Sequence, residues 1–267
     1  MVPYPGLWRR WRLLSCKTWC KTGPMISVVI PTLNDQAHVA ETMSSLVPAA
    51  VDGLVREVIV ADGGSTDRTL EIADSAGAEI LKAPSGRGAQ LKAGAERARF
   101  PWLLFLNPDS FLDPGWEREA GLHIERVEKG RRRPSAAAFR FALDDEGMMP
   151  RLFEQLSSWR GSLLKLPYGD QGLLVSRALY EEAGGFATLP LMEDVDLVRR
   201  IGRGRVTLLN ARIVTSAARY RRYGYGSRLV RSQARLGLYL LGMPVSRIAN
   251  LFGPDAGPVG EPLAERR

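Results

Sequence analysis

The stretch ISVVIPTLN at residues 26–34 decides the fold, because a short and largely β-branched run is followed at once by polar residues. Runs of this kind are typical of strands that are buried on both faces of a parallel sheet. Three further runs share this design, namely EVIVAD (57–62), AEILKA (78–83) and WLLFLNPDS (102–110). Helical patterns separate them. The alternation predicts right-handed crossovers and ligand binding beyond the carboxyl ends of the strands.

The connecting segments predict helices on both sides of this sheet. Apolar residues recur at helical spacing from Val39 to Val47, and we expect Asn34 to cap that helix and Pro48 to limit it. The second half is less regular and predicts a mixed sheet that completes a binding site. Further helices are predicted at 66–77, 87–97, 115–129, 150–164 and 177–184 and from about residue 193, and further strands at 136–143 and 173–176.

The chain divides into four expected segments. Residues 1–24 form a basic extension that we expect to lie outside the fold, and residues 25–218 form one α/β domain. Residues 219–252 predict a basic amphipathic helical appendage, and residues 253–267 a disordered tail rich in Pro, Gly and charge. For the extension two readings stay open: translation could start at Met25, or its tryptophans could form an amphipathic membrane anchor.

The positive charges gather near the two ends of the chain. Five Lys and Arg and no acid fall in residues 1–24, and seven Arg and no acid fall in residues 219–254. Removing these twelve charges from the net charge of +8 leaves −4 for the remainder, which argues against a nucleic-acid-binding protein. Basic ends suit a phosphorylated ligand or an anionic membrane surface.

The cysteines and the apolar runs bear on location. Cys16 and Cys20 are the only cysteines, which suits a reducing compartment. No apolar run reaches the roughly 18–20 residues that a membrane span needs. We therefore expect a cytoplasmic protein, with peripheral binding at the inner face of the membrane as one option.

Polar motifs follow three of the predicted strands and resemble those of family-2 glycosyltransferases. The motifs are PTLN (31–34), DGGS (62–65) and NPDS (107–110), and MEDVDL (192–197) extends the resemblance. It implies a GT-A fold over about residues 25–218: a Rossmann-like, mostly parallel central sheet flanked by helices, with a mixed acceptor-side half. The segments GRGAQLKAGA (86–95) and PYGDQG (167–172) look most like a bacterial subgroup of glycosyltransferases associated with radical-SAM/selenodomain proteins.

Several residues are candidates for binding the nucleotide-sugar donor that this resemblance implies. A carboxylate at a strand end, Asp62, can accept hydrogen bonds from a base or ribose, although it could instead cap the next helix. Arg87 and Lys92 follow a Gly-rich turn at a helix start, where anions such as a diphosphate are favoured, although a solvated basic turn is the alternative. The other donor-binding candidates are Pro31, Thr32, Asn34 and Asn107.

Asp109 is the candidate metal ligand. Its carboxylate follows an apolar strand and could bind Mg²⁺ or Mn²⁺, which would also hold the donor diphosphate. It resembles the last acid of the family's Asp-x-Asp element, whose first position is Asn107 here. The alternative is a simple turn after a strand.

The paired acids at the start of the helix near residue 193 are the candidates for chemistry. By resemblance to the family's Glu-Asp element, Asp194 is the expected general base and Glu193 positions the acceptor. Acids are also favourable in any first helical turn. Asp170 and Gln171, in a Gly-flanked loop, could bind a hydroxylated acceptor or simply form a turn.

The resemblance therefore implies transfer of a sugar from a nucleotide-sugar donor to an acceptor hydroxyl, inverting and assisted by a divalent metal. A lipid-linked acceptor is one option, because Arg228, Arg231 and Arg235 fall on one face of the predicted C-terminal helix. Two other functions stay open: a non-catalytic nucleotide-sugar-binding or scaffold protein, and a sugar nucleotidyltransferase. The latter usually has a Gly-rich loop where this chain has PTLN.

Overall fold

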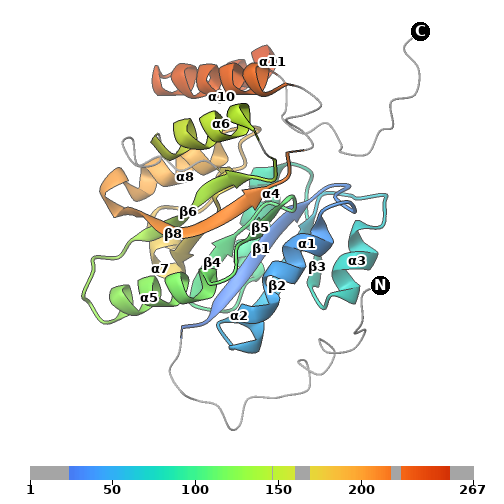
Figure 1. Cartoon of the computed structure of the whole chain (residues 1–267), viewed down its shortest axis with the longest axis vertical. Helices are drawn as coiled ribbons and strands as arrows, with labels where there is room; N and C mark the ends of the chain where they lie inside the picture. The colour runs from blue at the N-terminus through green and yellow to red at the C-terminus, as the bar shows by residue number, and fades with distance from the viewer. Residues whose placement is uncertain (1–23, 146, 160–168, 218–223, 253–267) are drawn as a thin grey trace.

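A computed structural model describes residues 24–145, 147–159, 169–217 and 224–252, which form an α/β fold around one eight-stranded sheet (Figure 1). The expectations for residues 1–23 and 253–267, the two cysteines included, lie outside these residues. The strand order is β3-β2-β1-β4-β7-β6-β8-β5. The strands are β1 (Ile26–Thr32), β2 (Val55–Asp62), β3 (Glu79–Lys82), β4 (Trp102–Phe105), β5 (Ser110–Leu112), β6 (Ala136–Leu143), β7 (Leu173–Ser176) and β8 (Val206–Thr215).

The sheet is parallel at one end and mixed at the other, as the sequence predicts. The neighbours β3, β2, β1 and β4 all run parallel. Strand β7 then pairs antiparallel with both β4 and β6, and β8 pairs parallel with β6 and antiparallel with β5. This arrangement confirms the expected parallel core with a mixed second half.

The central strand β1 is buried along its whole length because both of its faces are covered. Val28 and Ile30 belong to one hydrophobic cluster, and Val29 between them belongs to a second cluster on the opposite face. Successive side chains of a strand point to opposite faces, so a continuous apolar run is what a doubly covered strand requires.

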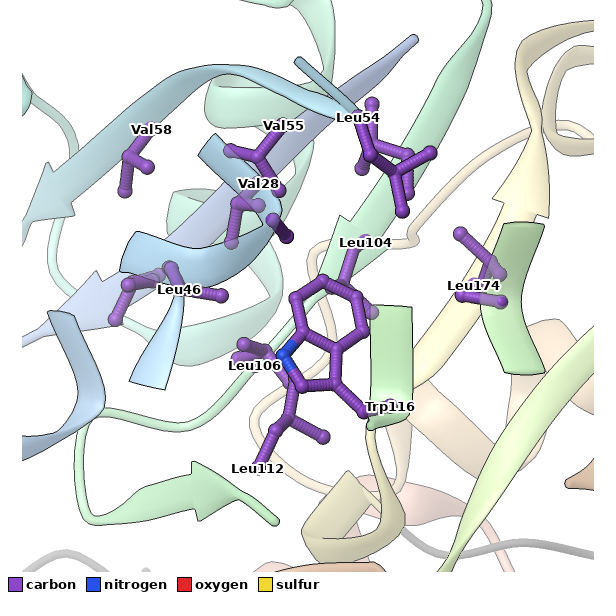
Figure 2. Packing of buried hydrophobic residues seen from close by; sticks show 14 of the residues in the cluster. Val28, Leu46, Leu54, Val55, Val58, Leu104, Leu106, Leu112, Trp116 and Leu174 are labelled. Carbon is purple, nitrogen blue, oxygen red and sulfur yellow. The ribbon is translucent and has the colours of Figure 1, made fainter. Parts of the chain in front are cut away.

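Four helices pack on the first face of the sheet. They are α1 (Val39–Ser45), α2 (Val47–Val51), α3 (Thr69–Ser75) and α5 (Trp116–Glu128). The indole of Trp116 lies among Leu104, Leu106 and Leu112 (Figure 2), and its ring nitrogen donates to the carbonyl of Ser45 at 3.1 Å. One side chain from α5 thereby joins the central strand β4, the edge strand β5 and the end of α1.

The second face carries α4 (Arg87–Arg97), α7 (Arg177–Glu182) and α8 (Glu193–Ile201), which contribute to the other hydrophobic cluster. Beyond α8 lie α6 (Met148–Trp159) and two C-terminal helices, α10 (Tyr225–Leu240) and α11 (Val245–Phe252) (Figure 1). We call α10 and α11 the C-terminal hairpin. It packs against α8 and the segment before it through Leu191, Met192, Val195 and Leu236.

The structure departs from the predicted elements at three places. The strand expected over 102–110 is two strands, because Asn107, Pro108 and Asp109 carry the chain from the central β4 to the edge strand β5. Asn34 does not cap a helix: it adopts a left-handed backbone, with φ +58°, and α1 begins only at Val39. Strand β8, which the sequence did not predict, completes the mixed half of the sheet.

Within the described residues no helix is long and apolar enough to cross a membrane. Where the sequence predicts a helical appendage, the described residues form α10 and α11. Its arginines do not share one environment, however, because the Arg235 guanidinium is buried, donates to the carbonyl of Phe252 at 3.1 Å and lies over that ring. Arg235 therefore fastens α11 to α10.

Two helical glycines provide a matched test of the packing. A Cβ built on Gly94 of α4 would lie 2.3 Å from Cγ1 of Val29, whereas a Cβ on Gly121 of α5 would meet nothing within 4 Å. We expect Gly94→Ala to destabilise the protein by about 1–3 kcal/mol through overpacking against β1. Gly121→Ala should stabilise it by roughly 0.5–1 kcal/mol, because alanine favours a helix. Thermal unfolding of both variants would measure this, and equal effects would contradict the packing described.

Candidate functional site

The carboxylate of Asp62 builds a tight turn at the carboxyl ends of β1 and β2. Its Oδ2 accepts from the backbone N–H groups of Gly64 and Ser65, each at 2.9 Å. Its Oδ1 accepts from the Thr32 hydroxyl at 3.2 Å and from the Ser65 hydroxyl. A carboxylate offers about four acceptor sites, so all of them are used here. Asp62 could bind a nucleotide directly only by exchanging one of these bonds.

The same turn is tied to the segment after β1. The Asn34 N–H donates to the Ser65 hydroxyl at 2.9 Å, and the Thr66 N–H donates to Oδ1 of Asn34 at 2.8 Å. These reciprocal bonds, together with the left-handed backbone of Asn34, join the two strand ends into one rigid rim. The helix that follows is not capped by Asp62, since α3 begins at Thr69, whose N–H donates to Asp67.

A glycine follows Asp62 because Gln90 occupies the space beside it. The Gln90 amide donates to the carbonyls of Thr32 at 2.7 Å and Ala61 at 2.9 Å. A Cβ on Gly63 would lie 2.9 Å from that amide nitrogen, and Gln90 is buried and held by two bonds. A side chain at position 63 would therefore disturb the junction of β1 and β2.

Helix α4 begins at the rim of the sheet and directs Arg87 inward. Gly86, just before it, has φ +118°, and a Cβ on Gly88 would lie 2.5 Å from the carbonyl oxygen of Ala187. Only glycine permits this close approach of the helix start to the loop before α8. The approach brings Arg87 within reach of α8.

Arg87 and three residues from other segments of the chain are joined by hydrogen bonds and an ion pair, and we call these four residues the Arg87 network. Nη2 of Arg87 donates to Oδ1 of Asn107 at 2.7 Å, and its Nη1 pairs with the carboxylate of Glu193. Nδ2 of Asn107 in turn donates to Oδ1 of Asp170 at 3.1 Å. All four residues are sequence candidates, and the structure brings them together.

The network carries excess negative charge. Burial alone would lower the pKa of Arg87, but the carboxylates of Glu193, Asp194 and Asp170 together raise it above its ordinary value. One cation thus faces three carboxylates. A diphosphate entering this field would be repelled unless a further cation accompanied it.

The loop that carries Asp109 is held from two sides. The Thr42 hydroxyl of α1 donates to the carbonyl of Pro108 at 2.7 Å, and the N–H of Ser216 donates to the carbonyl of Asp109 at 3.0 Å. The Ser110 and Thr215 hydroxyls lie 2.9 Å apart beneath it. Asp109 is 8 % exposed and lies in the loop between β4 and β5.

These residues fit a divalent ion that is shared with a ligand. Among the residues that the structure describes, no three His, Cys, Asp or Glu side chains converge as a complete metal site. Mg²⁺ is commonly held by one or two carboxylates together with substrate phosphates and water. The single carboxylate of Asp109, in a region with excess negative charge, matches that mode of binding.

The start of α8 presents the two acids. Met192, immediately before them, has φ +63°, which a residue with a side chain rarely adopts. Glu193 is buried against Arg87, whereas Asp194 is only partly buried, with one carboxylate oxygen accepting from the Val195 N–H at 2.7 Å. Asp194 is therefore the acid better placed to meet a ligand.

The remaining candidates have other surroundings. Gln171 is 1 % exposed and its amide donates to the carbonyl of Phe139 at 3.3 Å, so it fastens its loop to β6. Lys92 is exposed on α4, and Pro31 is buried within β1. The sequence missed the supporting residues Gln90, Thr42 and Ser216, because they act on backbone groups that are distant in the chain.

Residues 27–131 match the family described as Glycosyl transferase family 2. Part of the chain is 40 % identical over 82 residues to glucosyl-3-phosphoglycerate synthase of Mycobacterium tuberculosis, covering 30 % of this chain and 25 % of that protein. It is also 33 % identical over 102 residues to a PGL/p-HBAD biosynthesis glycosyltransferase of the same species, covering 33 % and 37 %. The match thus spans about a quarter of the length of the synthase.

Solved structures resemble the fold more widely. A crystal structure of the M. tuberculosis glucosyl-3-phosphoglycerate synthase with Mn²⁺, UDP and glucosyl-3-phosphoglycerate gives a TM-score of 0.53 at 22 % identity, covering 83 % of this chain and 81 % of that one. TarS of Staphylococcus aureus with UDP-GlcNAc gives 0.52 at 17 % identity, covering 72 % and 58 %. These similarities show a GT-A fold. Assignment to the radical-SAM/selenodomain-associated subgroup stays a prediction.

Proposed function

We propose that this chain transfers a sugar from a nucleotide-sugar donor to an acceptor hydroxyl, because residues 27–131 match Glycosyl transferase family 2 and the chain has a GT-A fold. The observation that carries this proposal is the Arg87 network, which gathers a phosphate-binding cation and the paired acids of α8 at the carboxyl ends of the strands. Ligands of open α/β sheets bind at such an edge.

On the donor side, Arg87 is the group that would face the diphosphate. Its guanidinium lies in the first turn of α4, where backbone N–H groups and the helix dipole also favour an anion. The rim built by Asp62, Thr32 and Asn34 would face the nucleoside. A divalent ion held by Asp109 would supply positive charge to the leaving diphosphate.

On the acceptor side, Asp194 is the proposed general base. Its carboxylate takes the proton of the acceptor hydroxyl as that oxygen bonds to the anomeric carbon, and the bond between sugar and diphosphate breaks with its electron pair passing to the diphosphate. Attack from the face opposite the leaving group inverts the anomeric centre. Glu193 and Asp170 would position the acceptor, with Glu193 also holding Arg87.

A non-catalytic donor-binding protein is the alternative function, and a sugar nucleotidyltransferase is a less favoured one. The first would bind UDP or GDP without releasing nucleoside diphosphate from any donor. The second would release pyrophosphate as it joins a nucleoside triphosphate to a sugar 1-phosphate. Two screens separate the three functions: UDP-glucose, UDP-GlcNAc and GDP-mannose are tested for released nucleoside diphosphate, and UTP or GTP with a sugar 1-phosphate is tested for released pyrophosphate.

The first test of the base is Asp194→Asn. The amide keeps the shape but cannot take the proton, so donor turnover should fall by about 10²–10⁴-fold while UDP affinity changes little. Asp196→Asn on the same helix is the matched control, because Asp196 pairs with Arg200 instead of the network. Near-normal turnover of Asp194→Asn would exclude this assignment.

The second test concerns the metal. Binding of UDP, measured by calorimetry with Mn²⁺ or Mg²⁺ and with chelator, should require the ion, and Asp109→Asn should remove that requirement along with most of the affinity. Asp113→Asn is the control, since that carboxylate pairs with Arg212 and lies outside the site. Equal UDP affinity with and without chelator would contradict the proposal.

We also propose that the C-terminal hairpin rests on an anionic membrane, which would suit a lipid-linked acceptor. The hairpin exposes Val230, Leu240, Leu241 and Leu251, and its exposed Arg231 and Arg247 add positive charge. Residues 219–254 contain seven arginines and no acid. Exposed apolar side chains beside basic ones are the combination that binds anionic lipid surfaces.

Vesicles of phosphatidylglycerol and phosphatidylcholine would test this surface. Leu240→Glu combined with Leu241→Glu should weaken sedimentation with anionic vesicles by at least about tenfold and leave donor turnover unchanged. Val51→Glu is the control, because Val51 is 66 % exposed on α2, away from the hairpin (Figure 1). Binding that does not depend on the anionic lipid would count against the proposal.

A further inference from the structure

Asn107 is the one member of the Arg87 network that cannot carry charge, and it stands between two groups of opposite hydrogen-bonding character. The guanidinium of Arg87 can only donate, and the carboxylate of Asp170 accepts. Oδ1 of Asn107 accepts from Arg87 at 2.7 Å and 3.3 Å, and Nδ2 donates to Asp170 at 3.1 Å. An amide in this orientation satisfies both neighbours at once, which a carboxylate cannot do.

We propose that Asn107 is a positioning residue that couples the donor-side Arg87 to the acceptor-side Asp170. This inference rests on the proposed glycosyl transfer, in which Arg87 faces the diphosphate and Asp170 the acceptor. Asn107 follows directly from the central strand β4, and Asp170 lies in a short 3-10 turn before β7, the antiparallel neighbour of β4. The amide thereby links the parallel half of the sheet to the mixed half.

The backbone around Asn107 is fixed, so its amide can act as a rigid bridge. The bonds from Thr42 to Pro108 and from Ser216 to Asp109 hold the residues that follow it. Leu106, which precedes it, is buried, and its N–H donates to the carbonyl of Val29 at 3.1 Å. If Asp170 or Arg87 moves, this loop therefore does not move with it.

A carboxylate at position 107 would not serve the same purpose. It would accept from Arg87, but it would face Asp170 with like charge and no proton to donate. Arg87 would then be held by two carboxylates, at positions 107 and 193, and would be less available to a diphosphate. The neutral amide at position 107 adds no further negative charge to the carboxylates that already face the Arg87 guanidinium.

An exchange of the two side chains tests the bridge directly. Asn107→Asp removes the donor to Asp170 and sets two carboxylates face to face, so it should lower Tm by roughly 3–6 °C. Asp170→Asn replaces the charged acceptor with a neutral amide oxygen, so it should lower Tm less. The double variant Asn107→Asp with Asp170→Asn restores one N–H donor opposite one carboxylate and keeps the net charge. Its Tm should return close to that of the wild type, which is the signature of a direct interaction.

Nucleotide binding separates positioning from bulk stability. At a temperature where every variant is folded, Asn107→Asp should weaken UDP affinity in Mn²⁺ by about tenfold, and the exchanged variant should keep most of that loss, because carboxylates at positions 107 and 193 still hold Arg87. Asn210→Asp is the matched control, because Asn210 also accepts from an arginine, Arg140, at 2.9 Å but is exposed on β8. It should change neither Tm nor UDP affinity appreciably.

Two results would overturn the inference. If the two single effects on Tm simply add in the double variant, the side chains do not interact. If Asn107→Asp keeps or strengthens UDP binding in Mn²⁺, the amide does not serve Arg87. A wild-type protein that binds neither UDP nor GDP would instead count against the proposed function, while the Tm comparison would still report on the bridge.

Discussion

The guanidinium of Arg87 is the point through which the site is assembled. It directly bonds both Asn107, in the loop after β4, and Glu193, in the first turn of α8. Its position depends on backbone approach, since Gly88 lets α4 lie against the loop at Ala187 and Gly94 lets the same helix lie on β1. The Arg87 side chain is only half-buried, but it stays with Glu193, whose carboxylate is buried and would be costly to leave unpaired. The bonds of Arg87 thus hold the site together, and the close approaches at Gly88 and Gly94 fix where α4 lies.

The donor-side rim and the Arg87 network have opposite electrostatic designs. At the rim, the carboxylate of Asp62 accepts four hydrogen bonds from neighbouring residues, which makes the turn rigid. Around Arg87, the carboxylates of Glu193, Asp194 and Asp170 face one cation, which leaves negative charge for other groups to neutralise. A rigid rim suits recognition of a nucleoside by its shape. The excess negative charge around Arg87 suits a divalent ion that binds together with a diphosphate.

The C-terminal hairpin is coupled to the proposed base through α8. Leu236 packs with Met192, whose left-handed backbone costs about 1–3 kcal/mol and persists only where the surroundings hold it. The hydroxyl of Tyr239 donates to Asp196 at 3.3 Å, and Arg199 lies over the Tyr239 ring. The surface proposed to meet a membrane therefore also supports the turn that presents Glu193 and Asp194.

The sequence by itself determined the parallel half of the sheet and the candidate residues at its edge, because strand burial and strand-end polarity are local patterns. A β-branched run such as 26–31 can be buried on both faces only in a covered sheet, and its neighbours at 57–62 and 102–105 share that pattern. The tertiary structure alone decided which candidates meet. Asn107, Asp170 and Glu193 are far apart in the chain and come together because β7 inserts beside β4 and α8 packs across α4. It also decided that Asp62 is internally bonded and that β8 completes the sheet, since these depend on contacts between distant backbone groups that no local pattern encodes.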